Sequence, residues 1–188
     1  KPVSMQGDAV HPGPPGQLMM AAALLKELGA GGFVSSAAVD AAGKVVEARG
    51  CTVDGVKADA GKLEFDRLDE RLPFPIPDEA RQVVAFYPTI LDLSRYTLKV
   101  TGLKGGGHAL KINGIPTAVL RAAELEAGVN LTAFGVMSVN PIATQMRAIL
   151  AAVSAKEGIV GQWRGLSQKA HAAGADPALK EQLAALTR

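Results

Sequence analysis

Cysteine, histidine and aromatic residues are all scarce in this chain of 188 residues. The single cysteine, Cys51, excludes a disulfide within the chain and a cysteine-rich metal site. The three histidines lie far apart and have no ligand cluster around them, so neither a metal nor another cofactor is expected. Aromatic residues make up 4% and the formal net charge is +2, without a basic cluster interleaved with aromatics. Nucleic-acid binding is therefore not indicated.

Long hydrophobic runs are also missing. The apolar run at residues 18–25 is much shorter than the roughly 20 residues that a membrane-spanning helix needs. No membrane segment and no signal peptide are expected from this sequence. With 48% hydrophobic and 20% charged residues, the composition is that of a globular protein with a core of good size.

What the chain does contain is a carboxylate three residues before a histidine, in the segment Asp8-Ala9-Val10-His11-Pro12. A neutral imidazole accepts a proton from a hydroxyl when its other nitrogen carries a hydrogen, and a nearby carboxylate holds that hydrogen. Pro12 disfavours helical dihedrals at His11, which predicts a loop. His11 is therefore a candidate general base and acid, with Asp8 as its orienting partner. The alternative interpretation is a pair of surface residues in a flexible loop.

A helix is predicted directly after this loop. Pro14 and Pro15 suit its first turn, residues 17–28 are mostly apolar, and Gly29 suits its C-terminal end. A helix that is apolar on several sides is normally buried on more than one face. If the covering surface lies outside this chain, we expect the chain to form dimers or larger oligomers.

The residues around the pair resemble the last conserved block of the SGNH (GDSL-type) hydrolases, a family of lipolytic and other esterases. The matching positions are Gly7 to Pro12, Gly16, Leu18, Met20, Ala21, Leu25 and Leu28 to Ala30. Further segments look like the C-terminal extension of some bacterial members, at residues 34–36, 40–46, 72–75, 95–103 and 128–131. The resemblance implies that Asp8 and His11 belong to a Ser-His-Asp triad. Because relatives with this extension are often exported, it also suggests a secreted or periplasmic origin.

The family's other catalytic segments have no counterpart here. Its nucleophilic serine stands in a Gly-Asp-Ser motif near the start of the domain, and its oxyanion donors lie between that serine and the Asp/His block. The chain thus resembles the C-terminal portion of a longer enzyme, and a complementing N-terminal segment is one expected partner. The serines considered as substitutes are Ser4, Ser35, Ser36 and Ser138, none of which stands in a Gly-x-Ser-x-Gly elbow. Ser4 is favoured slightly, because it is near the pair in sequence.

The pattern predicts an α+β fold with three regions. Residues 1–31 are expected to be the remnant of an SGNH α/β hydrolase domain, whose N-terminal part is absent. Residues 32–135 read as a sandwich-like module of mainly antiparallel strands, with hairpin turns at residues 40–43, Asp54-Gly55 and Asn113-Gly114. Residues 136–188 read as helices. The first of these is capped by Asn140 and ends before Gly158, with Trp163 in the link to a last helix that opens at Asp176-Pro177.

These observations lead to two hypotheses for function. The first is serine-type ester hydrolysis, with this chain supplying the His–Asp part of the triad and acting on a small ester or an acetylated carbohydrate, the substrate class that the resemblance implies. The second is a non-catalytic β-rich accessory module for carbohydrate binding or oligomerisation, suggested by the missing nucleophile and the long strand region.

Overall fold

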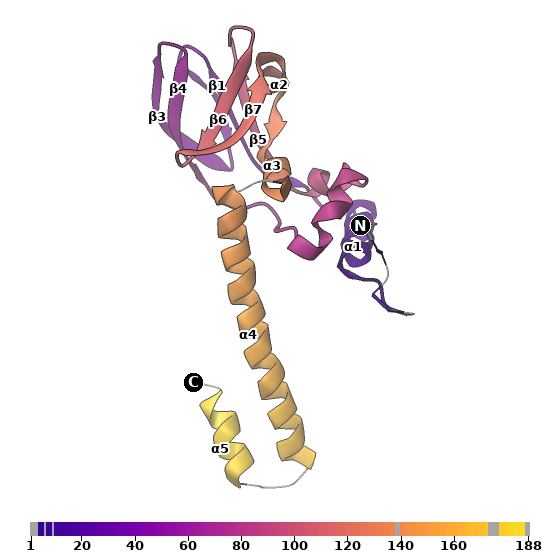
Figure 1. Cartoon of the computed structure of the whole chain (residues 1–188). Helices are drawn as coiled ribbons and strands as arrows, with labels where there is room; N and C mark the ends of the chain where they lie inside the picture. Colours follow the sequence, from indigo (N-terminus) through magenta and orange to yellow (C-terminus); the bar gives the residue numbers. More distant parts are fainter. Residues whose placement is uncertain (1–3, 6, 9, 138–139, 173–176, 187–188) are drawn as a thin grey trace. The chain divides into compact units, whose positions relative to one another are not determined.

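The protein is described by a computed structural model, which covers residues 4–5, 7–8, 10–137, 140–172 and 177–186. The chain divides into two compact units, Lys1–Met146 and Arg147–Arg188. The first unit combines antiparallel strand pairs with flanking helices (Figure 1), which confirms the expected α+β class. The division at residues 31 and 135 that the sequence suggested stays a prediction.

The central element of the first unit is a four-stranded sheet in the order β2-β1-β5-β8. Its strands are β1 (Phe33–Asp40), β2 (Val45–Arg49), β5 (Arg95–Thr101) and β8 (Val129–Asn130). β1 pairs antiparallel with β2 through the predicted turn, in which the N–H of Asp40 donates to the carbonyl of Lys44. β1 pairs in parallel with β5, which is the exception in a fold expected to be mainly antiparallel. Two 3-10 helices, η1 (Asp78–Ala85) and η2 (Pro88–Leu93), lie in the long connection ahead of β5, and such a connection permits parallel pairing.

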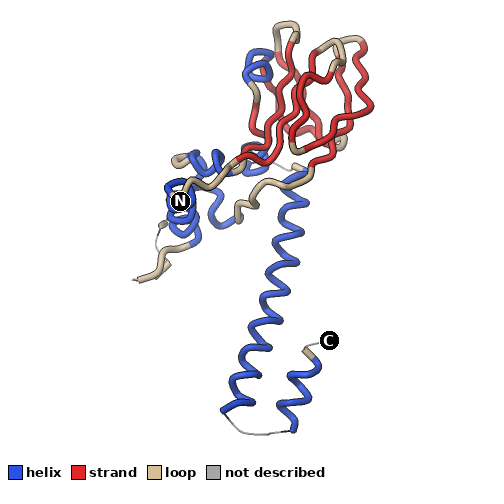
Figure 2. The backbone as a smooth tube through the Cα atoms, turned by 180° about the vertical axis from the view of Figure 1, so that it is seen from behind, coloured by secondary structure: helices blue, strands red, loops and turns tan. Residues whose placement is uncertain are grey.

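Two hairpins accompany this sheet, and Figure 2 shows all the long strands gathered in one part of the unit. The first hairpin pairs β3 (Cys51–Asp59) with β4 (Lys62–Asp69), and the second pairs β6 (Gly107–Ile112) with β7 (Ile115–Arg121). The second turns at Asn113-Gly114, as predicted. Partly buried side chains of both hairpins, Leu63, Phe65, Leu110 and Ile112, pack against the core cluster that contains the β5 residues.

The hairpin predicted at Asp54-Gly55 is wrong. These residues lie inside β3, where the register with β4 shifts between Asp54 and Lys57. The chain instead reverses at Ala60-Gly61, where both residues have positive φ, of 43° and 82°, as a two-residue hairpin of this kind requires. Gly55 also has a positive φ, of 62°, so the Asp-Gly signal marks a bulge and not a turn.

The main core forms where β5 meets the elements that follow it. Tyr96, Leu98 and Val100 point from β5 into this core at alternate positions. They are joined there by residues of β7, α2 (Ala122–Ala127), α3 (Leu131–Met137) and the start of α4 (Pro141–Ala172), namely Leu120, Leu125, Leu131, Ile142, Ala143 and Met146. The sheet is thereby covered by apolar side chains from several segments.

A second, smaller cluster holds the N-terminal helix α1 (Pro14–Glu27). Ala22 of α1 is buried against Val83 of η1 and Ile90 of η2, with Leu18 and Met19 partly buried beside them. The opposite side of the helix stays open, with Met20, Leu24 and Leu28 at 64%, 61% and 73% exposed. The predicted helix is present, and its burial on one side only leaves an exposed apolar face.

The second unit contains most of α4 and the short helix α5 (Pro177–Ala185). α4 begins as predicted, because Oδ1 of Asn140 accepts the N–H of Ile142 at 2.9 Å. It does not end at Gly158, and Trp163 lies within the helix and not in a link. A glycine inside a helix costs only about 1 kcal/mol relative to alanine, which does not stop propagation. Asp176, predicted to open the last helix, lies outside the described residues.

The length and apolar character of a helix decide whether it can cross a membrane. Among the described residues, none of the helices combines the length and the apolar character that crossing a bilayer requires.

Candidate active site

Asp8 and His11 lie in a tight turn that the aspartate side chain itself closes. Oδ1 of Asp8 accepts the backbone N–H groups of Val10 and His11, both at 2.7 Å. The carbonyl of His11 accepts the N–H of Gly7 at 3.0 Å and that of Asp8 at 3.2 Å. An aspartate that accepts amides two and three residues ahead forms an Asx-type turn. The backbone therefore brings the carboxylate and the imidazole to the same side.

The imidazole of His11 contacts the Asp8 carboxylate through its Nδ1 atom. Nδ1 lies 2.9 Å from Oδ2 and 3.1 Å from Oδ1. Because an ionised carboxylate only accepts hydrogen bonds, Nδ1 donates to it, and in a neutral ring Nε2 then holds the lone pair. The His11 side chain is 75% exposed and that of Asp8 is 61% exposed. Nε2 is thus the nitrogen left to accept a proton from another group.

The electrostatics of the turn favour the charged form of Asp8. The N–H of His11 is the largest cause that lowers the pKa of the Asp8 carboxyl below its usual value of 3.8, followed by the His11 ring and the N–H of Val10. An ionised Asp8 near neutral pH is the state that can hold Nδ1–H and stabilise an imidazolium.

The serines considered as nucleophiles fall into different places. Ser35 lies in β1, fully buried, and its hydroxyl donates to Asp69 and accepts from Arg67. A hydroxyl held in this way cannot attack a substrate. Ser36 is the next residue of β1, Ser4 is exposed, and Ser138 lies outside the described residues.

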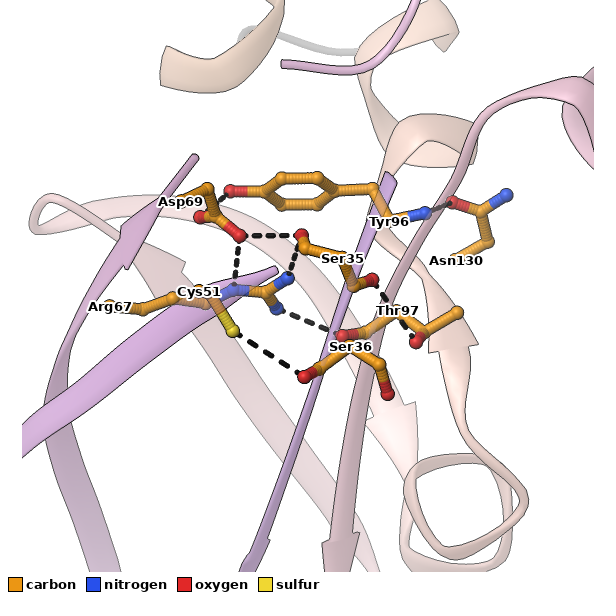
Figure 3. A network of polar contacts seen from close by, with 8 residues as sticks. All are labelled: Ser35, Ser36, Cys51, Arg67, Asp69, Tyr96, Thr97 and Asn130. Atoms are coloured by element: carbon orange, nitrogen blue, oxygen red, sulfur yellow. Dashed lines mark hydrogen bonds and ion pairs between the residues drawn. The ribbon is translucent and has the colours of Figure 1, made fainter. Parts of the chain in front are cut away.

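A buried polar network, which the sequence analysis did not identify, surrounds Ser35 (Figure 3). Arg67 donates through Nε to Oδ1 of Asp69 at 3.0 Å, through Nη1 to the Thr97 carbonyl at 2.9 Å, and through Nη2 to the Ser35 hydroxyl at 2.7 Å. The Tyr96 hydroxyl donates to the other oxygen of Asp69. Every charged group in the network has a partner, which is what allows burial of the ion pair.

The Tyr96 ring and the Cys51 thiol make further contacts around this network. Arg67 lies over the ring of Tyr96, with its guanidinium carbon 4.3 Å from the ring centroid. The Cys51 thiol donates to the carbonyl of Ser36 at 3.4 Å, and burial raises the pKa of this thiol. Because the thiol is buried and held in its neutral form, Cys51 is a packing residue of the strand and not a reactive nucleophile.

The remaining histidines are His108 and His171. The ring of His108 in β6 contacts the Lys104 carbonyl through Nε2 at 2.9 Å, and His171 lies in α4. Within the part of the chain that the structure describes, no group of three or more histidine, cysteine or acidic residues is placed to hold a metal ion.

Comparison with protein-family models and with curated proteins found no match. A solved structure, a gut microbial diltiazem-metabolizing enzyme, is similar to this chain with a TM-score of 0.72 and 27% identity. The similarity covers 90% of this chain and 40% of the enzyme, so the chain spans less than half of that enzyme's length. The fold described above is therefore similar to part of a longer enzyme.

Proposed function

We propose that this chain supplies the histidine and the aspartate of a serine-type ester hydrolase of the SGNH type. The observation that carries the proposal is the pairing of His11 Nδ1 with the Asp8 carboxylate at 2.9 Å, on a histidine side chain that is 75% exposed. The similarity to part of an enzyme supports a catalytic role at a coarser level. The resemblance to the last SGNH block supports the finer assignment.

In the proposed reaction, a serine hydroxyl beside Nε2 attacks the ester carbonyl while His11 takes its proton. The resulting imidazolium is stabilised by the ionised Asp8. His11 then donates the proton to the departing alkoxide, which leaves an acyl-serine and an alcohol. A water molecule, deprotonated by His11, attacks the acyl-serine and releases the acid as the proton returns to serine. Asp8 keeps its charge throughout.

The serine in this scheme comes from a complementing polypeptide segment. Ser35 is excluded by its burial, and the chain has no Gly-Asp-Ser motif of the kind that holds the nucleophile in the SGNH family. The longer enzyme that this chain resembles has more than half of its length beyond the similar region, which is room for such a segment. We place the oxyanion donors on the same segment.

The substrate class that we propose is a short-chain ester, including an acetylated carbohydrate. Diltiazem carries an acetyl ester, so this drug is a suitable probe beside p-nitrophenyl acetate. Both report the same bond cleavage but differ strongly in size. A difference between their hydrolysis rates would show how much of the substrate the site contacts.

The test supplies the complementing segment as the part of the diltiazem-metabolizing enzyme that lies outside the similar region. With this segment present, it compares the full chain with His11→Ala and Asp8→Asn on both esters. We expect His11→Ala to remove the hydrolysis, and Asp8→Asn to lower its rate by about 10³–10⁴-fold because the tautomer is no longer held. His108→Ala, in β6, is the matched control and should leave the rate unchanged. Equal rates for the wild type and His11→Ala would contradict catalysis by this chain. A fluorophosphonate probe followed by mass spectrometry would then identify any serine that is activated independently of His11.

A further inference from the structure

We propose that the first turn of α1 positions His11, through the side-chain amide of Gln17 and through the missing side chain of Gly16. This inference rests on the proposed function of the Asp8–His11 pair and names the residues that hold that pair in place. Neither residue reaches the reacting atoms, so both are positioning residues and not catalytic ones.

Gly16 allows the chain that leads into the turn to lie against the helix. The N–H of Gly13 donates to the Met5 carbonyl at 2.9 Å. A Cβ atom on Gly16 would stand 2.5 Å from that carbonyl oxygen and 2.9 Å from Cβ of Pro12. Contacts this short require a backbone shift, because the nearest obstacle is a carbonyl and not a flexible side chain. Met5 also packs against the cluster around Ala22, so its place is tied to that of α1.

Gln17 holds the other end of the turn. Its side-chain Nε2 donates to the carbonyl of Pro12 at 2.9 Å, and its backbone N–H donates to the carbonyl of Gly13 at 2.9 Å. Pro12 directly follows His11, so the glutamine amide holds the Pro12–Gly13 peptide, one residue beyond the histidine, against α1. The Gln17 side chain is exposed.

These two contacts differ in kind from the bonds inside the turn. The Asp8–His11 bonds keep the ring next to its own carboxylate, wherever the turn lies. Among the described residues, the contacts with Gly16 and Gln17 join the turn to α1, which in turn packs on η1 and η2. A nucleophile from another segment has to meet Nε2, and a misplacement of about 1 Å can cost about 10²-fold in rate.

Gln17→Glu is the decisive variant. Glutamate has nearly the same shape but no N–H to donate, while a negative charge in the first turn of a helix is favourable. The helix should therefore keep its stability, while the turn loses the hydrogen bond from Gln17 to the Pro12 carbonyl. We expect the ¹⁵N order parameters of Asp8, Val10 and His11 to fall from about 0.85 to below about 0.6. Gln162→Glu, on exposed α4, is the matched control and should leave them unchanged.

Gly16→Ala gives a second, independent test. We expect the same loss of order at Asp8, Val10 and His11, whereas Gly31→Ala should have no effect because nothing lies within 4 Å of its added Cβ. Gln17→Lys restores a donor at this position and should recover most of the order that Gln17→Glu loses. Thermal unfolding of each variant shows whether the helix itself is retained.

The outcomes separate this inference from the proposed function. Unchanged order in both Gln17→Glu and Gly16→Ala overturns the positioning role, whatever the activity. A mobile turn in Gln17→Glu supports the positioning role even when the wild type and His11→Ala hydrolyse esters equally, a result that overturns only the proposed function. If the chain is active, Gln17→Glu should lower kcat and leave KM nearly unchanged.

Discussion

Arg67 and Asp69 form an ion pair, 3.0 Å long, in which the two side chains are only 10% and 7% exposed. They stand two residues apart on β4 and therefore point to the same side of the strand. Through Ser35 and Tyr96 the pair joins the β3–β4 hairpin to the neighbouring strands β1 and β5. A buried pair of this kind is stabilising only as long as both members are present.

We predict that Asp69→Ala lowers the free energy of unfolding by about 3–5 kcal/mol, because it leaves the Arg67 guanidinium buried without its counter-ion. The double variant Arg67→Met, Asp69→Leu should recover most of this loss. Urea unfolding followed by circular dichroism measures both. Glu64→Ala is the control, since it breaks an exposed ion pair with Lys62 on the same strand and should change little. A loss of stability in the double variant as large as in Asp69→Ala would contradict the argument.

Tyr96 should make the stability depend on alkaline pH. Burial, followed by the hydrogen bond to Asp69, raises the pKa of the Tyr96 phenol well above its ordinary value of 10. The unfolded chain then ionises this group before the folded chain does, so the contribution is complete below pH 10 and is lost as the pH rises further. Tyr96→Phe should flatten this decline between pH 9 and pH 11. An equally steep decline in the variant would show that other groups cause it.

Local patterns predicted most of the elements but not their long-range contacts. The hairpin turns at residues 40–43 and 113–114, the helix after Pro14 and the cap at Asn140 all rest on neighbours in sequence, and all are present. The Asp54-Gly55 turn failed because the same dipeptide also fits a bulge. The parallel pairing of β1 with β5 depends on a long connection, whose path local residue preferences do not determine.

The buried network and the candidate site likewise separate into local contacts, which could be predicted, and long-range contacts, which could not. The Asp8–His11 contact is local and could be predicted, whereas the network around Arg67 joins residues 27 to 34 positions apart. One signal was nevertheless available in β4, where Leu63, Phe65, Arg67 and Asp69 share the inward side. Two charged residues that continue an apolar stripe predict a buried ion pair, although not the partners that complete it.

We predict that the pKa of the Asp8 carboxyl stays below its usual value even without the imidazole. The backbone N–H of His11 is the largest cause of the lowered pKa, and His11→Ala retains it. The pKa should therefore return only part of the way in that variant. Because the pKa is lowered, the turn is favoured above the ordinary value of 3.8 and loses this support as the pH falls below it. Carboxyl ¹³C NMR of the wild type and His11→Ala measures the shift, and full return to the ordinary value would contradict the turn.

The exposed face of α1 should cause the isolated chain to associate. Met20, Leu24 and Leu28 are all more than half exposed on a helix that otherwise packs on η1 and η2. Removing such apolar side chains from water is favourable, so concentrated solutions should contain dimers or larger species. Light scattering after size exclusion should show a mass that rises with concentration. Leu24→Glu with Leu28→Glu should shift it toward the monomer, whereas Leu68→Glu, at an exposed position of β4, should not. A monomer at every concentration would mean that this face needs no cover in water.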